Sequence, residues 1–168
     1  LAAASPLWAG DEAPALTNCL QITRALAEAD TGRTFDVTAT SLVDSPQLSY
    51  SVTIEDDSGA TRLNSSVLPL PTNLAAGNVI RATGTIRKWE DGRIVTECRT
   101  FEVVSPGTPP APRRMSVSQA LADESANRFV EVSGSVADVC CDEIDPHFIS
   151  FSIVDPTGVV YAYVPSGS

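Results

Sequence analysis

The stretch Arg33-Thr34-Phe35-Asp36-Val37-Thr38-Ala39-Thr40 reappears about 95 residues later as Arg128-Phe129-Val130-Glu131-Val132-Ser133-Gly134-Ser135. In both copies apolar side chains alternate with polar ones, which is the pattern of a strand with one buried face. The similarity resumes further on, where residues 50–59 match residues 149–158. A repeat of this length exceeds that of solenoid units and falls in the range of small domains, so the sequence predicts two tandem domains.

The repeat divides the 168 residues into four parts. Residues 1–15 form an apolar, proline-containing arm, residues 16–105 the first predicted domain and residues 113–168 the second. Between the domains, the four prolines of residues 106–112 predict an extended, semi-rigid linker. The second copy stops at Ser168, where the first copy continues into a further hairpin, so we expect the second domain to be incomplete in this chain.

Each copy is predicted to begin with a short helix, at residues 23–29 and 118–123, and Ser116 or Ser118 can cap the second. We expect Gly59 to supply a positive φ in the turn at 56–59, and Gly84 to mark a β-bulge. Alternation and turn signals predict five strands in the first copy and three in the second, at residues 35–40, 50–55, 60–63, 79–88, 93–104, 130–135, 149–154 and 159–164.

Short antiparallel strands with tight turns after the second and the fourth strand suit a particular all-β fold. The prediction is two tandem OB-like five-stranded barrels, each preceded by a short helix, with the second incomplete in this chain. An immunoglobulin-like sandwich is the alternative, but it fits poorly with five strands and a helix before each first strand.

Composition argues against two kinds of partner. The net charge of −10 and the lack of a basic cluster oppose the grip on phosphates that nucleic-acid binding needs. No apolar run is long enough to span a bilayer, so we expect membrane contact only through a segment outside this chain. The apolar residues 1–10 resemble the end of a secretory signal, which favours an extracytoplasmic location, periplasmic or secreted; an ordinary apolar arm is the alternative.

Four segments of the sequence carry a resemblance to a known group of proteins: Phe101-Glu-Val-Val-Ser-Pro-Gly-Thr-Pro-Pro-Ala-Pro112, Ser116-Val-Ser-Gln-Ala-Leu-Ala122, Arg128-Phe-Val-Glu-Val-Ser-Gly-Ser-Val136 and Val159-Val-Tyr-Ala-Tyr-Val-Pro165. They resemble the tandem OB-like region at the extracytoplasmic N-terminus of some bacterial sensor histidine kinases and related signalling proteins, and the similarity covers residues 16–168. The resemblance implies a sensor domain of a two-component system, in which a membrane segment and a cytoplasmic transmitter follow the module.

The four cysteines raise two questions, a disulfide and a metal site. A Cys19–Cys98 disulfide would join the chain before the first helix to the last strand of the first domain, and two separate buried thiols are equally compatible with the sequence.

The densest group of potential metal ligands is Cys140, Cys141, Asp142 and His147, in a predicted loop of the second copy. Adjacent cysteines do not easily ligate one tetrahedral ion, so a solvated loop without metal is the favoured interpretation.

Ligand binding is predicted most directly at the last hairpin of the first copy. Trp89 stands beside Arg87 and Arg93 there, and an aromatic ring next to cations suits a saccharide or a small anion. The alternative is that Trp89 only covers the end of the barrel.

The outward faces of the central strands offer no ring on which a base could stack, since they carry residues 51, 53 and 55 or 150, 152 and 154. Tyr161 and Tyr163 share one face of a strand and are equally compatible with the core.

The function we expect is a non-catalytic, extracytoplasmic sensing or interaction module of a bacterial signalling protein. His147 is the single histidine and no nucleophile motif accompanies it, so we expect no catalysis and no cofactor in this region. The partner would be a small ligand or a protein, with a homodimer as a further expectation and nucleic acid excluded. The alternatives are a secreted or periplasmic small-molecule or saccharide binding protein, and an accessory domain of a larger enzyme.

Overall fold

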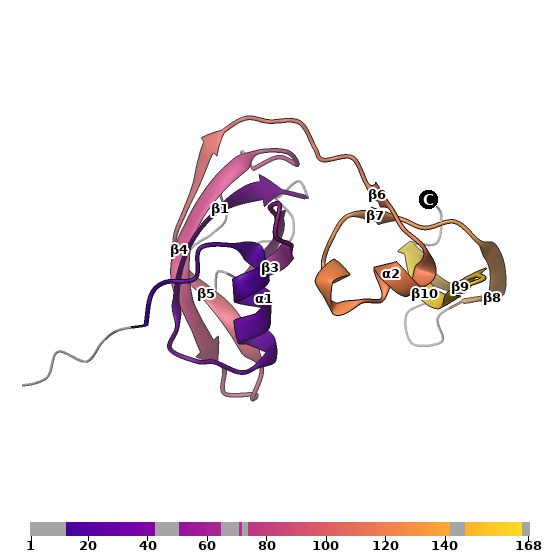
Figure 1. Cartoon of the computed structure of the whole chain (residues 1–168), viewed down its shortest axis with the longest axis horizontal. Helices are drawn as coiled ribbons and strands as arrows, with labels where there is room; N and C mark the ends of the chain where they lie inside the picture. Colours follow the sequence, from indigo (N-terminus) through magenta and orange to yellow (C-terminus); the bar gives the residue numbers. More distant parts are fainter. Residues whose placement is uncertain (1–12, 43–50, 65–70, 72–73, 142–146, 166–168) are drawn as a thin grey trace, which may run out of the picture.

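The computed structural model describes residues 13–42, 51–64, 71, 74–141 and 147–165. Strands make up most of this part of the chain, and they form a five-stranded sheet, a three-stranded sheet and a two-stranded pair (Figure 1). We call residues 13–105 the N-terminal region and residues 113–165 the C-terminal region. The predicted arm up to residue 12 and the start of the second predicted strand lie outside the described residues.

The N-terminal region contains one helix and a five-stranded antiparallel sheet. The strand order is β3-β2-β1-β4-β5, so that β1 lies in the middle and pairs with both β2 and β4. Gly84 lies at a shift in the register between β4 and β5, which confirms the predicted bulge. A side chain there would collide with the carbonyl oxygen of Glu97 and the ring of Phe35. The elements are α1 (Cys19–Ala27), β1 (Thr34–Ser41), β2 (Ser51–Glu55), β3 (Ala60–Asn64), β4 (Val79–Lys88) and β5 (Ile94–Ser105).

The β-rich prediction holds, but this sheet is open, so the five described strands do not close into a barrel. No backbone ladder joins the edge strands β3 and β5 in the described sheet. They are linked instead through one side chain, because the Thr96 hydroxyl accepts from the Asn64 backbone N–H at 2.8 Å and donates to the Arg62 carbonyl at 3.2 Å. A bridge through a side chain holds β3 and β5 further apart than a backbone ladder would, so the sheet stays open between these two strands.

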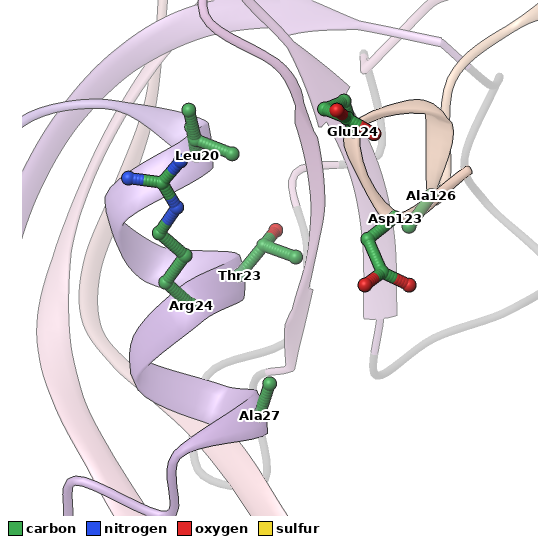
Figure 2. Close-up of a pocket in the computed structure, with 7 residues that line it drawn as sticks. All are labelled: Leu20, Thr23, Arg24, Ala27, Asp123, Glu124 and Ala126. Carbon is green, nitrogen blue, oxygen red and sulfur yellow. The ribbon is translucent and has the colours of Figure 1, made fainter.

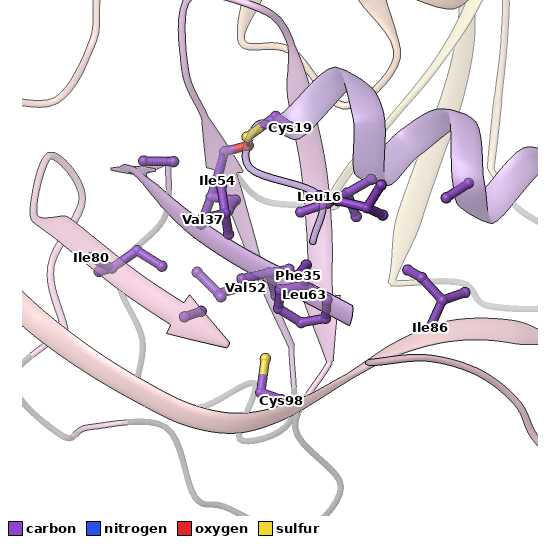
Figure 3. Packing of buried hydrophobic residues seen from close by; sticks show 14 of the residues in the cluster. Leu16, Cys19, Phe35, Val37, Val52, Ile54, Leu63, Ile80, Ile86 and Cys98 are labelled. Carbon is purple, nitrogen blue, oxygen red and sulfur yellow. Dashed lines mark hydrogen bonds between the residues drawn. The ribbon is translucent and has the colours of Figure 1, made fainter. Parts of the chain in front are cut away.

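The core of the N-terminal region lies between the sheet and α1 (Figure 3). The inward residues of β1, β2 and β4 are almost fully buried, as their alternation predicts. The largest fully buried side chains in this cluster are Phe35, Ile22, Ile54, Leu63, Ile80 and Ile86. Burial of this apolar set is the main source of stability for the region.

Helix α1 begins one turn earlier than the predicted range of 23–29 and ends at Ala27, because two groups cap its N-terminus. Asn18 accepts a hydrogen bond from the Gln21 backbone, as an N-cap residue does. The carboxylate of Asp56, in the turn between β2 and β3, accepts from the Cys19 backbone N–H at 2.8 Å. The helix is therefore fastened to a hairpin that follows it by some 37 residues.

The C-terminal region contains a three-stranded sheet in the order β10-β9-β8 and a short parallel pair, β6 with β7. The predicted strand at 130–135 is broken, since β7 ends before Gly134, which lies against the carbonyl of Val154. The predicted helix at 118–123 is also shifted toward the N-terminus, and Ser116 caps it as expected. The elements are β6 (Arg113–Arg114), α2 (Val117–Ala120), η1 (Asp123–Ser125), β7 (Val130–Glu131), β8 (Ser135–Cys141), β9 (Phe148–Asp155) and β10 (Gly158–Pro165).

The strand register of the two regions agrees with the sequence repeat. Thr40 lies opposite Glu55 in the N-terminal region, and their repeat counterparts, Ser135 and Val154, lie opposite each other in the C-terminal region. The same holds for the hairpins, because Val52 faces Leu63 and Phe151 faces Ala162.

The turn of each hairpin also makes the same bonds. Asp155 accepts from the Val117 backbone N–H at 2.9 Å, as Asp56 accepts from Cys19. The Thr157 hydroxyl accepts from Ser118, and the Ser58 hydroxyl accepts from the Leu20 backbone in the same way. The prediction that Gly59 needs a positive φ is wrong, since the positive-φ glycines of the described residues are Gly32, Gly77 and Gly92.

The linker runs along the N-terminal region before it reaches β6 (Figure 1). A Cβ atom on Gly77 would collide with the backbone of Thr108 and Pro109, and Gly107 touches the Gly77 carbonyl. Residues 107–109 therefore lie against the connection that leads into β4. None of the helices in the described part of the chain combines the length and apolar character that crossing a membrane requires.

Candidate functional site

At the hairpin loop between β4 and β5, two of the three predicted ligand-binding residues, Arg87 and Trp89, line a hollow of about 450 Å³, and the third, Arg93, lies over the Trp89 ring. The Arg93 guanidinium carbon lies 4.9 Å from the centroid of the Trp89 ring, and its Nε donates to Asp91 at 2.7 Å. Arg87 pairs with Glu97 at 2.9 Å. Hydrogen bonds from the Arg93 backbone and side chain hold the pKa of Asp91 below its usual value. Binding of an anion here stays a prediction, and the anion has to compete with both carboxylates.

Cys19 and Cys98 are free thiols, so the predicted disulfide is absent and the alternative of two separate buried thiols describes the structure. Their sulfur atoms lie well apart within the core (Figure 3). Burial raises the pKa of Cys98 to about 12. Burial, together with the charge of Asp56, raises the pKa of Cys19 as well. Both sulfurs therefore stay protonated and behave as small apolar side chains.

The candidate metal ligands do not converge. Cys140 and Cys141 lie in strand β8, where we had expected a loop, and adjacent strand residues point to opposite faces. Cys140 faces Ser150, with Sγ and Oγ 3.0 Å apart, whereas Cys141 lies opposite Ile149. Asp142 lies outside the described residues, and His147 stands just before β9. No group of three metal-ligating side chains occurs in the part of the chain that the structure describes.

Tyr161 and Tyr163 do not belong to the core. They are 73% and 63% exposed and lie on the same face of β10. Their cross-strand neighbours are Ser152 and Ser150, which the sequence places on the outward face. The expectation that this face carries no ring is therefore wrong, because β10 contributes two.

The two regions meet at an ion pair that the sequence analysis missed. Arg128 donates to the carboxylate of Glu55 at 2.8 Å, and both side chains are only 8% exposed. The Nε of Arg128 donates at 3.0 Å to the backbone carbonyl of Glu124, in η1. Arg113 adds a second, more exposed contact to Glu55 at 3.3 Å. One buried guanidinium thus fastens η1 to the end of β2.

The sequence held one sign of this contact. Arg128 stands at the repeat position of Arg33, which bonds within its own region to Asp30 and to the Pro14 carbonyl. Glu55 has an apolar counterpart, Val154, in the second copy. Glu55 is thus charged where its repeat counterpart is apolar, and this difference in the sequence could have indicated a charged partner for Glu55.

A cleft of about 490 Å³ lies beside this ion pair, between α1 and η1 (Figure 2). Leu20, Thr23, Arg24 and Ala27 line one wall, and Asp123, Glu124 and Ala126 line the other. The Arg24 guanidinium is directed away from the Asp123 carboxylate, so the two walls do not close on each other through an ion pair. Glu124 lines the cleft and accepts from Arg128, so the position of this wall depends on how Arg128 holds η1.

Comparison with known proteins adds little. No protein-family model matches the chain, and no curated protein matches it. Among solved structures, the chain has a similarity to a protein described as an aspartyl-tRNA synthetase from Leishmania major Friedlin, with 12% identity and a TM-score of 0.40 over 66% of this chain. The chain spans 25% of that protein's length. A similarity at this level carries no argument about fold or activity.

Proposed function

We propose that the chain is a non-catalytic sensing and interaction module, made of two tandem OB-like units, in the extracytoplasmic part of a larger bacterial signalling protein. The observation that carries the proposal is the buried Arg128–Glu55 pair, which joins the two regions. The equal register of the two hairpins supports the tandem arrangement, as do the matching bonds that Asp56 and Asp155 accept from the first turn of each helix. The sequence resemblance supports the signalling context.

A sensing module has to transmit a structural change from its ligand site to a distant part of the protein. The Arg128–Glu55 pair between the two regions is suited to that. Removing either partner of a buried ion pair leaves an uncompensated charge, so the pair favours one relative position of its two elements over all others. A ligand or partner that prefers a different position of the C-terminal region would shift this equilibrium by its difference in affinity. The shift would reach β2 and the β2–β3 turn, since Glu55 ends β2.

The proposal is tested by hydrogen exchange in the Arg128→Met variant. The substitution lies in the C-terminal region, and we expect faster exchange of backbone amides in β2 and β3 of the N-terminal region as well. The matched control is Arg114→Met, because Arg114 pairs with Glu131 within its own region and is largely exposed. We expect that control to leave β2 and β3 unchanged. If Arg128→Met also leaves them unchanged, the regions are independent and the sensing proposal fails.

A further inference from the structure

One face of the C-terminal sheet carries exposed aromatic rings beside two serines, of which Ser152 is buried. Its central members are Phe148, Ser150 and Ser152 from β9 and Tyr161 and Tyr163 from β10, which we call the aromatic face. The register places Tyr161 opposite Ser152 and Tyr163 opposite Ser150, so these side chains are direct neighbours. Phe148 is two residues before Ser150 and therefore lies on the same side. The two tyrosines and Phe148 are among the exposed large apolar side chains.

The N-terminal region shows that this is the outward face of the hairpin. Tyr161 and Tyr163 occupy the repeat positions of Arg62 and Asn64, which lie opposite Thr53 and Ser51 on the outer side of β3. The intervening residue Leu63 is 1% exposed and belongs to the core. Its counterpart, Ala162, is on the other side of β10. The exposure of the tyrosines therefore does not depend on whether the inner face of this sheet is covered.

The charge at the aromatic face excludes anionic ligands. The Ser152 hydroxyl donates to the Asp138 carboxylate at 3.3 Å, so one carboxylate lies at this face. This carboxylate and the net charge of −10 repel phosphates and other polyanions. A carboxylate oxygen also accepts hydrogen bonds, so an uncharged ligand rich in hydroxyl groups suits this surface.

The spacing of the rings indicates the shape of that ligand. Residues two apart on a strand are about 7 Å from each other, so the tyrosines form two steps of a flat ladder. The face of an aromatic ring is electron-rich and attracts the C–H groups of a saturated ring, and a phenolic hydroxyl can bond to a hydroxylated ligand. Neither phenolic hydroxyl has a hydrogen-bond partner among the described residues. The side chains that dominate protein–protein binding usually fill pockets. A row of rings along one strand is therefore less suited to a protein partner.

From this charge and spacing we infer that the aromatic face binds a neutral saccharide chain, with one sugar ring against Tyr161 and another against Tyr163. Phe148 extends the face for a further ring. The inference names the ligand class of the proposed module and so rests on that function. It adds no reaction, since the ligand is held and not changed.

The test is isothermal titration of the whole chain with neutral hexasaccharides: β-1,4-linked glucose, α-1,4-linked glucose and β-1,4-linked N-acetylglucosamine. We expect at least one to bind, and the double substitution Tyr161→Ser with Tyr163→Ser to weaken its binding by about tenfold or more. The double substitution to Phe keeps both rings and should retain most of the affinity. Arg62→Ser, at the repeat position of Tyr161, is the matched control and should bind as the unchanged chain does.

Three results would overturn the inference. The first is no binding of any hexasaccharide at about 1 mM, the range of weak complexes. The second is equal affinity of the double serine variant, with circular dichroism showing that it is folded. The third is preference for tetramethylammonium or a thymidine hexanucleotide over every saccharide. In each case the hydrogen-exchange response of Arg128→Met still decides the sensing proposal separately.

Discussion

In the N-terminal region the hairpin β2–β3 is part of a five-stranded sheet, whereas in the C-terminal region the equivalent hairpin β9–β10 has β8 as its described neighbour. The two hairpins share register and turn bonds, so these local features form without the extra strands. The two regions differ, however, in how far their apolar side chains are buried. Of the exposed large apolar side chains, Val104 lies in β5 and the others lie in the C-terminal region: Leu121, Phe129, Val136, Val139, Phe148, Val159, Tyr161 and Tyr163. Strands β4 and β5 therefore supply burial rather than the shape of the unit.

The largest expected effect comes from a matched pair of core substitutions. Ile54 is fully buried, and its repeat counterpart Ile153 is only half-buried. We expect Ile54→Ala to lower the free energy of unfolding by about 4 kcal/mol through lost burial and a cavity. Ile153→Ala should cost about 1 kcal/mol. Urea unfolding of both variants measures the difference, and equal losses would mean that the inner face of β9 is covered in solution.

The next effect concerns the junction. Glu55→Gln removes the charge that compensates the buried Arg128, and we expect a loss of about 3 kcal/mol. Glu131→Gln removes the partner of Arg114 on the surface and should cost less than about 0.5 kcal/mol. Thermal unfolding of the two variants compares them directly. Similar losses would contradict a special role for the junction pair.

A smaller effect is expected from the turn that caps each helix. Partial burial opposes ionisation of Asp56, but bonds from the Ser58 hydroxyl and the Cys19 backbone outweigh it, so its pKa lies below 3.8. We expect Asp56→Ala to cost about 1 kcal/mol at neutral pH, as for other helix caps. Asp155→Ala should cost less, because the surroundings of its carboxylate are less buried than those of Asp56.

The same substitution has a defined pH dependence. The folded-state pKa of Asp56 is lowered, so its stabilisation is complete above the unfolded pKa of about 3.9 and is lost as the pH falls through the folded value. Urea unfolding at several pH values should therefore show Asp56→Ala approaching the stability of the unchanged chain below about pH 3.9. A constant difference down to acidic pH would exclude a role of the ionised carboxylate.

The smallest effects are expected at the glycines of the two turns. Gly59 lacks a positive φ, and an added Cβ would meet only Leu20, at 3.5 Å or more. We expect Gly59→Ala and Gly158→Ala to change stability by less than about 0.5 kcal/mol. Gly92→Ala should cost about 1 kcal/mol, because Gly92 has a φ of 88°. Thermal unfolding resolves this order, and a large loss for Gly59→Ala would contradict the backbone geometry.

The sequence predicted local structure well where alternation and turn chemistry act over short distances. The strands of the first copy and the bulge at Gly84 agree closely with the structure. Closure of the barrel was not predictable, since it depends on whether the edges of β3 and β5 meet by a ladder or through Thr96. The outward aromatic rings were missed because the face was read from β9 alone, and the tyrosines stand on β10. The junction was missed because a contact between distant copies leaves no periodic signal.

The packing of Gly107, Thr108 and Pro109 against Gly77 has a mechanical meaning. A linker that is flexible along its whole length extends when the two domains move apart, and it passes no rotation from one domain to the other. Here residues 107–109 lie against the connection that leads into β4, and Arg113 at the start of β6 pairs with Glu55, so the stretch that can bend is the short one between them. A rotation of the C-terminal region would therefore be passed to the N-terminal region over a short distance, at the contact between the linker and Gly77.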